Sequence, residues 1–188
     1  SLLYFLAQLN LGLFPSIGSF PEQGCLQFFA GAKKEDAMVR YWADISQDTS
    51  DWSVPEHATL ANGPLNNEQA YSLDYTLVRE LMPHSDYRFK EHIGTQLKLG
   101  LEEEYWSMLK AYAALHNGSG HKLGGFAYFP QDDPRYAWAE EKELLFQLDS
   151  DPSIQCDWGA LGSGAFFISE AALGQANFSE VEFIQTRI

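Results

Sequence analysis

Seven side chains in the C-terminal half of this chain are of types that could carry chemistry. They are His121, Asp133, Arg135, Gln147, Asp149, Asp151 and Trp158. Alternating carboxylates, as in Asp149-Ser150-Asp151, can chelate a hard cation, and the fold could bring Asp133 to them. The run lacks the glycine and downstream glutamate of a calcium loop, and capping of turn N–H groups explains an Asp-Ser-Asp-Pro sequence. We therefore expect turn capping here and no metal ion.

His121, Asp133 and Arg135 flank a Gly-Gly turn and could together orient a polar or anionic ligand. The guanidinium of Arg135 could form a bidentate pair with a ligand carboxylate. Alternatively, Arg135 pairs with Asp133 or Asp149 and fixes the loop onto a sheet, which is the commoner use of such residues. Trp158 could form an aromatic wall of the same site, although aromatic residues in such segments more often belong to a core.

Gln147 has a counterpart near the start of the chain. Gln8-Leu9-Asn10 matches Gln147-Leu148-Asp149, and Gly24 with Phe28-Phe29 matches Gly162 with Phe166-Phe167. A unit that occurs twice indicates two related halves, near residues 1–31 and 121–173, within a single domain of residues 1–188. The repeated glutamine is expected to bond the backbone of a neighbouring loop, or else to line a cleft between the halves.

The positioning elements are predicted to be mostly short strands. Alternation over residues 2–10 places Leu3, Phe5, Ala7 and Leu9 on one face of a strand. Further strands are expected at 26–30, 39–43, 71–81, 124–130, 144–149 and 165–168, and 178–185 is expected to close a sheet edge. Residues 44–67 are expected to form an extended surface connection, and residues 131–138 a loop. The glycines of residues 157–164 are expected to permit positive φ angles and close approach of the backbone.

One amphipathic helix is predicted near residues 97–117. Apolar residues recur there every three or four positions, glutamates occupy its early turns, and Asn117-Gly118 ends it. We expect this helix to pack on a sheet as a scaffold. The fold class is therefore mainly β, a β-roll of antiparallel sheets with internal duplication, with α+β as the alternative.

Charge and motif content exclude several functions. The 188-residue chain has a formal net charge of −14, which disfavours nucleic acids and anionic membranes as partners. No nucleotide-binding loop, nucleophile elbow or metal-binding helix motif is present, so no cofactor is expected. The spacing of the two cysteines suggests no disulfide bond, and the sequence shows no signal-peptide pattern. Both observations lead us to expect a reduced, cytoplasmic setting. Because the chain lacks an initiator Met and starts inside a strand pattern, we also expect a missing upstream segment.

Several blocks resemble the YwqG-like family of bacterial proteins over nearly the whole chain. These blocks are residues 5–10, 26–29, 85–89, 121–131, 133–135, 145–151, 158–159 and 166–168. The resemblance implies a mainly-β roll with duplicated halves and attached helices, and no established activity, cofactor or catalytic residue. It also implies an acidic residue after the Trp-Gly pair, where this chain has Ala160, which weakens an enzymatic interpretation of that loop.

We therefore expect a non-catalytic binding or protein-interaction module whose partner is another protein or a small polar ligand. The alternative is a metal-assisted hydrolase that uses the carboxylates around Asp149–Asp151, with His121 as a proton shuttle. No nucleophile–base pair is recognisable in the sequence, and this favours the binding module.

Overall fold

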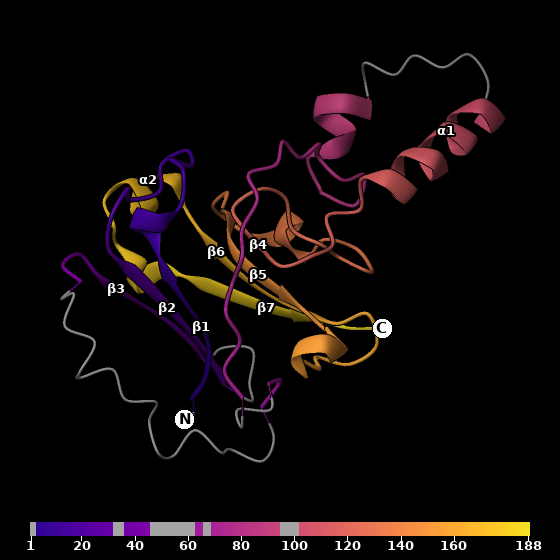
Figure 1. Ribbon diagram of the computed structural model, residues 1–188. Helices are drawn as coiled ribbons and strands as arrows, with labels where there is room; N and C mark the ends of the chain where they lie inside the picture. Colours follow the sequence, from indigo (N-terminus) through magenta and orange to yellow (C-terminus); the bar gives the residue numbers. More distant parts are fainter. Residues whose placement is uncertain (1–2, 32–35, 46–62, 66–68, 95–101) are drawn as a thin grey trace.

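Two antiparallel sheets form the body of the protein (Figure 1). The structure, a computed structural model, describes residues 3–31, 36–45, 63–65, 69–94 and 102–188. The first sheet has the order β1 (Leu3–Asn10), β2 (Cys25–Gly31), β3 (Ala37–Trp42). The second has the order β4 (Lys122–Leu123), β5 (Glu143–Asp149), β6 (Ser163–Ile168), β7 (Glu182–Thr186). The predicted mainly-β class is confirmed.

Helical segments are short apart from one. α1 covers Glu102–Leu115 and α2 covers Glu170–Gly174. Single helical turns occupy Leu11–Leu13, Lys90–Gly94, Pro134–Ala137, Pro152–Ile154 and Phe178–Glu180. The start of α2 is stabilised by Ser169, whose hydroxyl accepts a hydrogen bond from the N–H of Ala172.

β1–β2 and β5–β6 have the same register. Gln8 lies opposite Gln27 in the first pair, and Gln147 lies opposite Ala165 in the second. Each ladder is interrupted once, between Phe5 and Ala7 in β1 and between Leu144 and Phe146 in β5. Pairing resumes at Ala7 and at Phe146, in each case three residues before the matched Asn10 or Asp149. A bulge is a local feature that two unrelated hairpins have no reason to share. This common register supports the proposal of duplicated halves.

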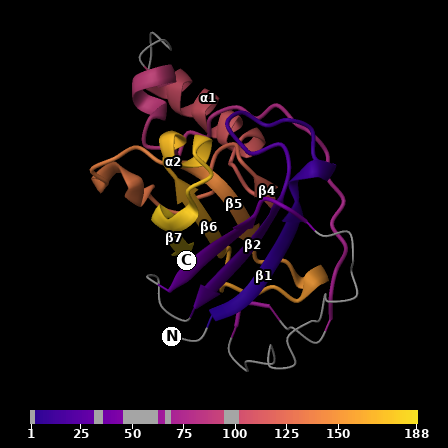
Figure 2. The same cartoon turned by 90° about the vertical axis from the view of Figure 1, so that its left-hand side faces the viewer.

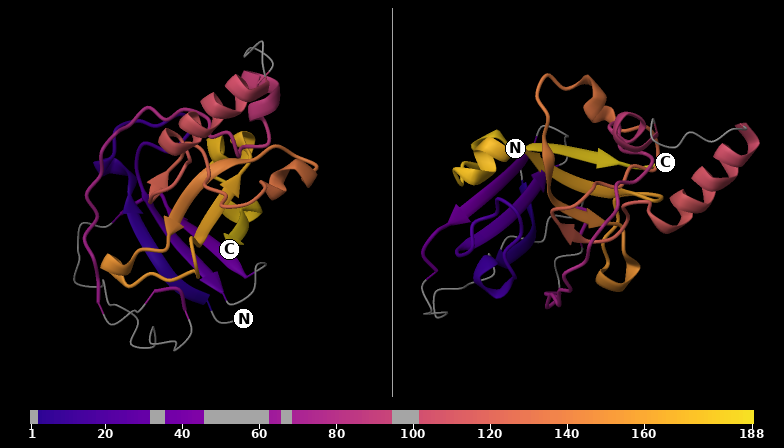
Figure 3. Two further views of the ribbon diagram at one scale, coloured as in Figure 1. Left: turned by 90° about the vertical axis from the view of Figure 1, so that its right-hand side faces the viewer. Right: turned by 90° about the horizontal axis from the view of Figure 1, so that it is seen from above.

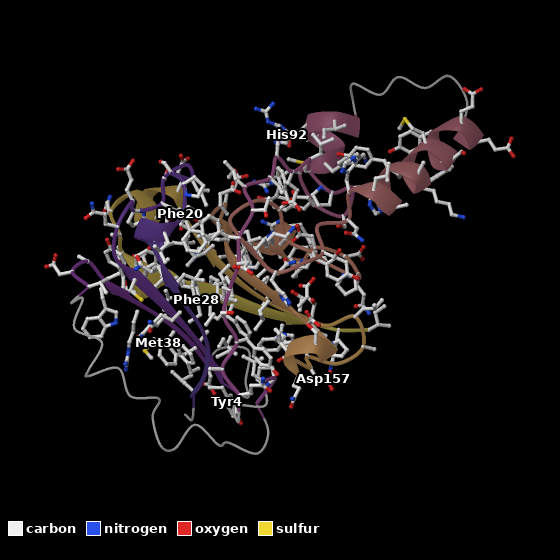
Figure 4. The ribbon with its side chains drawn as sticks, in the orientation of Figure 1. Tyr4, Phe20, Phe28, Met38, His92 and Asp157 are labelled. Carbon is white, nitrogen blue, oxygen red and sulfur yellow. The ribbon has the colours of Figure 1, made fainter. Side chains whose placement is uncertain are left out.

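The main core lies where the two sheets face each other. Phe28 of β2 stacks on Phe146 of β5 with ring centroids 4.3 Å apart and meets Phe166 of β6 edge-on at 5.2 Å. Figure 2 looks through the first sheet onto the second, and Figure 4 places Phe28 between them. Phe28 and Phe166 are fully buried, so burial of aromatic surface holds the sheets together.

A second, smaller core covers the outer face of the second sheet, the face turned away from the first. Ala127 and Phe129 of the loop that follows β4 lie over Leu144, Ala165 and Phe167. Phe129 and Phe167 are nearly parallel, with ring centroids 6.2 Å apart. The loop of residues 117–138 is therefore a structural layer, and most of the expected site residues belong to it or to the strands beneath it.

Three local expectations were wrong. The bulge at Leu6 breaks the alternation of β1, so Tyr4 is buried with Ala7 and Leu9, whereas Leu3 and Phe5 are only half-buried. Residues 71–81 are not a strand, because no neighbouring strand pairs with them. Residues 126–129 also leave the sheet: Gly124 and Gly125 have φ of +72° and +77°, which only glycine adopts easily, and they turn the chain away after β4.

The predicted helix exists, but its expected packing on a sheet does not. α1 projects from the body of the protein, and its resolved side chains are half-buried or exposed (Figure 3). It is attached near its C-terminal end, where the Tyr112 hydroxyl donates to the carbonyl of Met82 at 2.7 Å and the Tyr112 ring meets Phe89. Most of residues 44–67 and the helix start at 97–101 lie outside the described residues.

Candidate functional site

Gln147 holds the loop of residues 117–138 onto the second sheet. Its Nε2 donates to the carbonyls of Gly118 and Gly120, both at 3.0 Å, and its Oε1 accepts from the N–H of Tyr128 at 2.7 Å. Because Ala165 lies opposite on β6 and offers no polar group, the amide turns to the loop. The fully buried side chain uses both of its polar atoms for the fold and has no free group for a ligand.

Asp133 and Arg135 belong to a buried network with a second Asp-x-Arg sequence, Asp86-Tyr87-Arg88. Within each motif the aspartate Oδ1 accepts from both the backbone N–H and the Nε of the arginine two residues later, at 2.9–3.0 Å. Arg135 then links the two motifs through a 2.7 Å bond from one terminal nitrogen to Asp86 Oδ2. We call these four residues the paired Asp-Arg network.

The environment of the paired Asp-Arg network satisfies its charges. The Arg135 guanidinium lies 4.9 Å from the centroid of the Phe167 ring and 5.4 Å from that of Phe129. Burial by itself lowers the pKa of Arg135 and raises that of Asp86, but the hydrogen bonds and opposite charges outweigh it in both cases. Both groups therefore stay ionised, and the network anchors the loop that contains Asp133 to the segment around residue 86.

His121, Asp149 and Asp151 come together at the exposed end of β5. His121 Nδ1 accepts from the N–H of Asp149 at 3.1 Å, which assigns the proton of the neutral ring to Nε2, and Nε2 donates to Asp151 Oδ2 at 3.1 Å. Hydrogen bonds from Ser153 and then from His121 lower the pKa of Asp151. A histidine held in this way has no free ring nitrogen to take a proton from a substrate.

Three buried oxygens near this end of the sheet have no hydrogen-bond partner among the described residues. They are Asp149 Oδ1, Ser163 Oγ and Thr186 Oγ1. The three residues are direct cross-strand neighbours on β5, β6 and β7, so they form one row on the outer face. The other oxygen of Asp149 accepts from the N–H of Gly120 at 2.6 Å, and the negative charge of Asp149 adds to burial in raising the pKa of Tyr128.

Trp158 lies on the opposite face, in the core between the sheets. Its ring packs so closely on Gly164 of β6 that a Cβ there would come within 2.5 Å of it. A Cβ on Gly162, in the connection before β6, would come within 2.6 Å of the Trp158 Cβ, so both positions need glycine. Its indole N–H has no hydrogen-bond partner of normal geometry in the part of the chain that the structure describes. Burial, with nearby carboxylates, raises the pKa of the neighbouring Cys156 thiol to about 12, so this sulfur is a poor nucleophile.

The expected site residues therefore fall into separate groups. Asp133 and Arg135 join each other, as one of the two alternatives for Arg135 requires, and His121 joins Asp149 and Asp151. No hydrogen bond or ion pair within the described residues connects these two groups. Gln147 lies in the sheet beneath the loop, and Trp158 is on the other side of that sheet.

Sequence reasoning missed Asp86 and Arg88. They are 2% and 9% exposed, and Arg88 also pairs with Glu141 at 2.9 Å and Glu143 at 2.7 Å. The repeated Asp-x-Arg spacing was the signal that could have found them, because an aspartate that caps the N–H two residues later also lies within reach of that residue's side chain.

One comparison with known proteins gives a family. The description of that family is "domain of unknown function", and its model matches residues 1–185. The chain belongs to this family, DUF1963. No curated protein matches the chain at a significant level. Membership of DUF1963 leaves the assignment of function to the geometry of the protein.

Two searches of the described part of this DUF1963 domain found nothing. Within the described ranges, no group of three or more His, Cys, Asp or Glu side chains is arranged to hold a metal ion. A search of the same ranges finds no helix with the length and apolar character needed to span a membrane.

Proposed function

We propose that this DUF1963 domain is a non-catalytic module that binds another protein through an exposed apolar surface. The surface consists of the strap, residues 69–82, and an adjoining groove. The observation that carries the proposal is the exposure of the strap: Leu73, Leu77 and Val78 are 57%, 64% and 72% exposed. Contiguous exposed apolar side chains of this kind mark interaction sites.

The strap is held in place at its middle and near its C-terminal end. The Tyr75 ring lies 4.6 Å from that of Phe14, and its hydroxyl donates to the carbonyl of Leu13. Near the C-terminal end, Glu80 accepts from the N–H of Phe126 at 2.9 Å and pairs with Lys122. The strap thus connects the loop after β1 with the loop after β4 (Figure 1). Because side chains fix it, its apolar residues are presented without a further cost of ordering the segment.

A groove of about 300 Å³ adjoins the strap. Phe14, Ile17 and Phe20 of the loop after β1 line it, together with Leu123 of β4. Phe14 also touches Tyr75, so the groove and the strap are one surface. A side chain of a partner could enter this groove while its neighbours cover the strap.

The overall charge favours one class of partner. Glu22 lines the groove, the strap carries Asp74 and one cation, Arg79, and the whole chain has a formal net charge of −14. A basic protein with exposed apolar side chains is therefore favoured, and nucleic acid and anionic membranes are disfavoured. A small polar ligand is the weaker proposal, because the polar groups of the candidate residues are mostly engaged within the fold.

The hydrolase alternative retains one supporting observation. His121 contacts Asp151, and Asp149 Oδ1 in the same region has no partner among the described residues. Titration with Ca²⁺, Mg²⁺ and Zn²⁺ tests the metal-assisted form: heat of binding or a higher melting temperature that is lost in Asp149→Asn would establish the metal site that this form requires. Absence of both signals from the wild-type protein would contradict it.

A two-hybrid screen against fragments of the source genome tests the binding module. Three baits are compared: wild type, Leu77→Asp with Val78→Asp, and the matched control Ser72→Asp, which adds a charge to the strap without removing an apolar residue. The proposal is supported if prey proteins are found that bind the wild type and the Ser72→Asp control but not the double variant. If all interactions survive the double variant, or none is found, the proposed surface is wrong.

The remaining interpretations stay proposals. Membership of the YwqG-like subgroup, a single domain with duplicated halves, and a reduced cytoplasmic setting are all compatible with the structure. The shared register of β1–β2 and β5–β6 supports duplication. Two buried, unpaired cysteines, Cys25 and Cys156, support the reduced setting.

A further inference from the structure

A second groove, of about 530 Å³, follows the backbone edge of β7. One wall consists of four consecutive residues, Ile184, Gln185, Thr186 and Arg187. Side chains of a strand alternate between the two faces of a sheet, so a groove lined by consecutive residues runs along the edge and not over a face. β7 is the last strand in the order of the second sheet, and β4, which contributes to the strap surface, is at the other edge.

The outward backbone groups of β7 are unpaired in the described chain. β7 pairs with β6 on one side, and no hydrogen bond from another described segment reaches the backbone of residues 182–187 on the other. An edge strand with free N–H and C=O groups is a template for one more strand. Hydrogen bonding is therefore the chemistry that this groove offers to a ligand.

The opposite wall keeps the edge open. It is formed by residues 130–134 of the loop over the second sheet, including Pro130 and Pro134. Proline has no N–H, so these residues can contact β7 but cannot donate to its carbonyls. The wall is also fixed in place, because the neighbouring Asp133 and Arg135 are held by the paired Asp-Arg network. Pro130 and Pro134 thus reduce the number of N–H groups that the loop could offer to β7, and the network keeps the loop from moving away.

The dimensions fit a short extended peptide. Four strand residues span about 13 Å, and a groove of several hundred Å³ encloses a ligand of a few residues. A peptide residue opposite Ile184 would meet an apolar side chain. The groove contains one exposed acid, Asp132, and one exposed base, Arg187, so a basic residue would be placed beside Asp132. The net charge of −14 on the whole chain favours a basic segment overall. A second copy of this chain is disfavoured as the occupant, because each copy carries a net charge of −14.

We propose that the groove beside β7 binds an extended, basic segment of a partner protein, which adds to the second sheet as a strand. This site lies at the opposite sheet edge from the strap surface and does not depend on it. A partner that used both would present an apolar patch to the strap and a tail or loop to β7.

Selection from a phage-displayed library of short random peptides, followed by amide hydrogen exchange observed by NMR, tests the proposal. The expected peptides contain basic residues, and their binding slows exchange of alternate amides within residues 183–187. Asp132→Asn should weaken binding about twofold to fivefold, as expected for loss of one exposed charge pair. Glu103→Gln, on the surface of α1, removes the same charge elsewhere and should leave binding unchanged.

Proline variants separate edge pairing from contact with side chains. In Gln185→Pro and Thr186→Pro, one variant removes an N–H that points to β6 and the other an N–H that points to the groove, since neighbouring amides point in opposite directions. The variant that loses the groove-facing N–H keeps all its hydrogen bonds to β6 and is therefore recognised by its nearly unchanged melting temperature. That variant should weaken peptide binding about tenfold. If the peptide binds the variant without the groove-facing N–H as tightly as it binds the wild type, strand addition is contradicted.

Two further outcomes would overturn the β7 site: the library yields no enriched peptide, or the bound peptide slows amide exchange only in the strap. Protection of the strap would at the same time support the proposed function, so the two proposals remain distinguishable. Sedimentation of the wild type as a dimer that dissociates in the groove-facing proline variant would identify a second copy as the occupant and contradict a heterologous partner.

Discussion

On the outer face of the first sheet, Gln8 of β1 accepts a 2.7 Å hydrogen bond from Gln27, its direct neighbour on β2. On the second sheet, the matched Gln147 lies opposite Ala165 and bonds to three backbone groups of the covering loop instead. The strands share a register, but one polar residue in the cross-strand position decides whether the glutamine stays within its sheet or binds a loop. The difference teaches that a repeated residue need not have a repeated role.

The two outer faces also differ in how arginine is used. Arg40 of β3 is exposed and lies over the Phe29 ring at 5.3 Å. Arg135 is buried and bonded to Asp86 and Asp133. Only the second arrangement leaves buried charges behind when it is broken, so the same type of substitution should have very different costs on the two sheets.

The largest expected effect comes from Arg135→Met. The variant leaves Asp86 and Asp133 buried without their shared cation, and we expect a loss of about 3–5 kcal/mol in the free energy of unfolding. Arg40→Met on the first sheet should cost about 1 kcal/mol or less, because only an exposed cation–π contact is lost. Urea denaturation of both variants measures the contrast. Similar losses would show that the buried network does not hold the second sheet together.

The two glutamines give the next largest contrast. Gln147→Leu removes the partners of three backbone groups, and we expect a loss of about 3 kcal/mol. Gln8→Leu should cost about 1 kcal/mol or less, because Gln27 is half-exposed and can bond water. Hydrogen exchange should also show faster exchange of the Tyr128 amide in Gln147→Leu alone. Equal stability of the two variants would mean that Gln147 contributes no more to folding than Gln8 does.

Exchanging the cross-strand partners tests the cause of the difference. Gln27→Ala, which gives β2 the residue found on β6, should cost less than about 1 kcal/mol at its half-exposed position. Ala165→Gln should cost about 1–3 kcal/mol, since Ala165 is 2% exposed and the core has no room for a larger side chain. Thermal unfolding of both proteins provides the comparison. A tolerated Ala165→Gln would mean that the loop, and not the sheet, sets the path of Gln147.

Acid should weaken the second sheet before the first. The pKa of Asp86 is held below its ordinary value of 3.8 because the bonds and charges of Arg88 and Arg135 outweigh the effect of burial. A lowered folded-state pKa contributes stability that is fully present above pH 3.8 and is lost as the pH falls through the folded-state value. β1, β2 and β3 contain no carboxylate. Unfolding free energies from pH 7 to pH 2 should therefore fall less steeply below pH 4 in Asp86→Asn than in the wild type.

The smallest effect concerns the two cysteines, Cys25 of β2 and Cys156 of the connection between β5 and β6. Burial raises the pKa of both thiols, that of Cys156 to about 12, so neither forms a thiolate at neutral pH. We expect no reaction of the native protein with a thiol-specific disulfide reagent and two equivalents of reaction after denaturation. Rapid labelling of the native protein would show that the region around one cysteine opens locally. The position of the labelled cysteine would identify that region.

Much of the framework could be predicted from the sequence. The strands at β1, β2, β5 and β6, their matched register and the helix α1 followed from periodicity, turn residues and the repeated Gln-Leu-Asn/Asp block. Pairing of Arg135 with Asp133 could also be foreseen as an alternative, because both residues lie in one short loop. Such features depend on contacts between residues close in sequence or on a pattern that repeats.

The contacts between distant segments were decided only by the tertiary structure. The link from Arg135 to Asp86 spans 49 residues, and the sequence does not state which of many acids lies near which arginine. The strap was mistaken for a strand because an alternating apolar pattern cannot show whether a pairing partner exists. The free edge of β7 likewise depends on two prolines that the fold places beside it. Periodicity and local chemistry are properties of the chain, whereas pairing and exposure are properties of the folded assembly of elements.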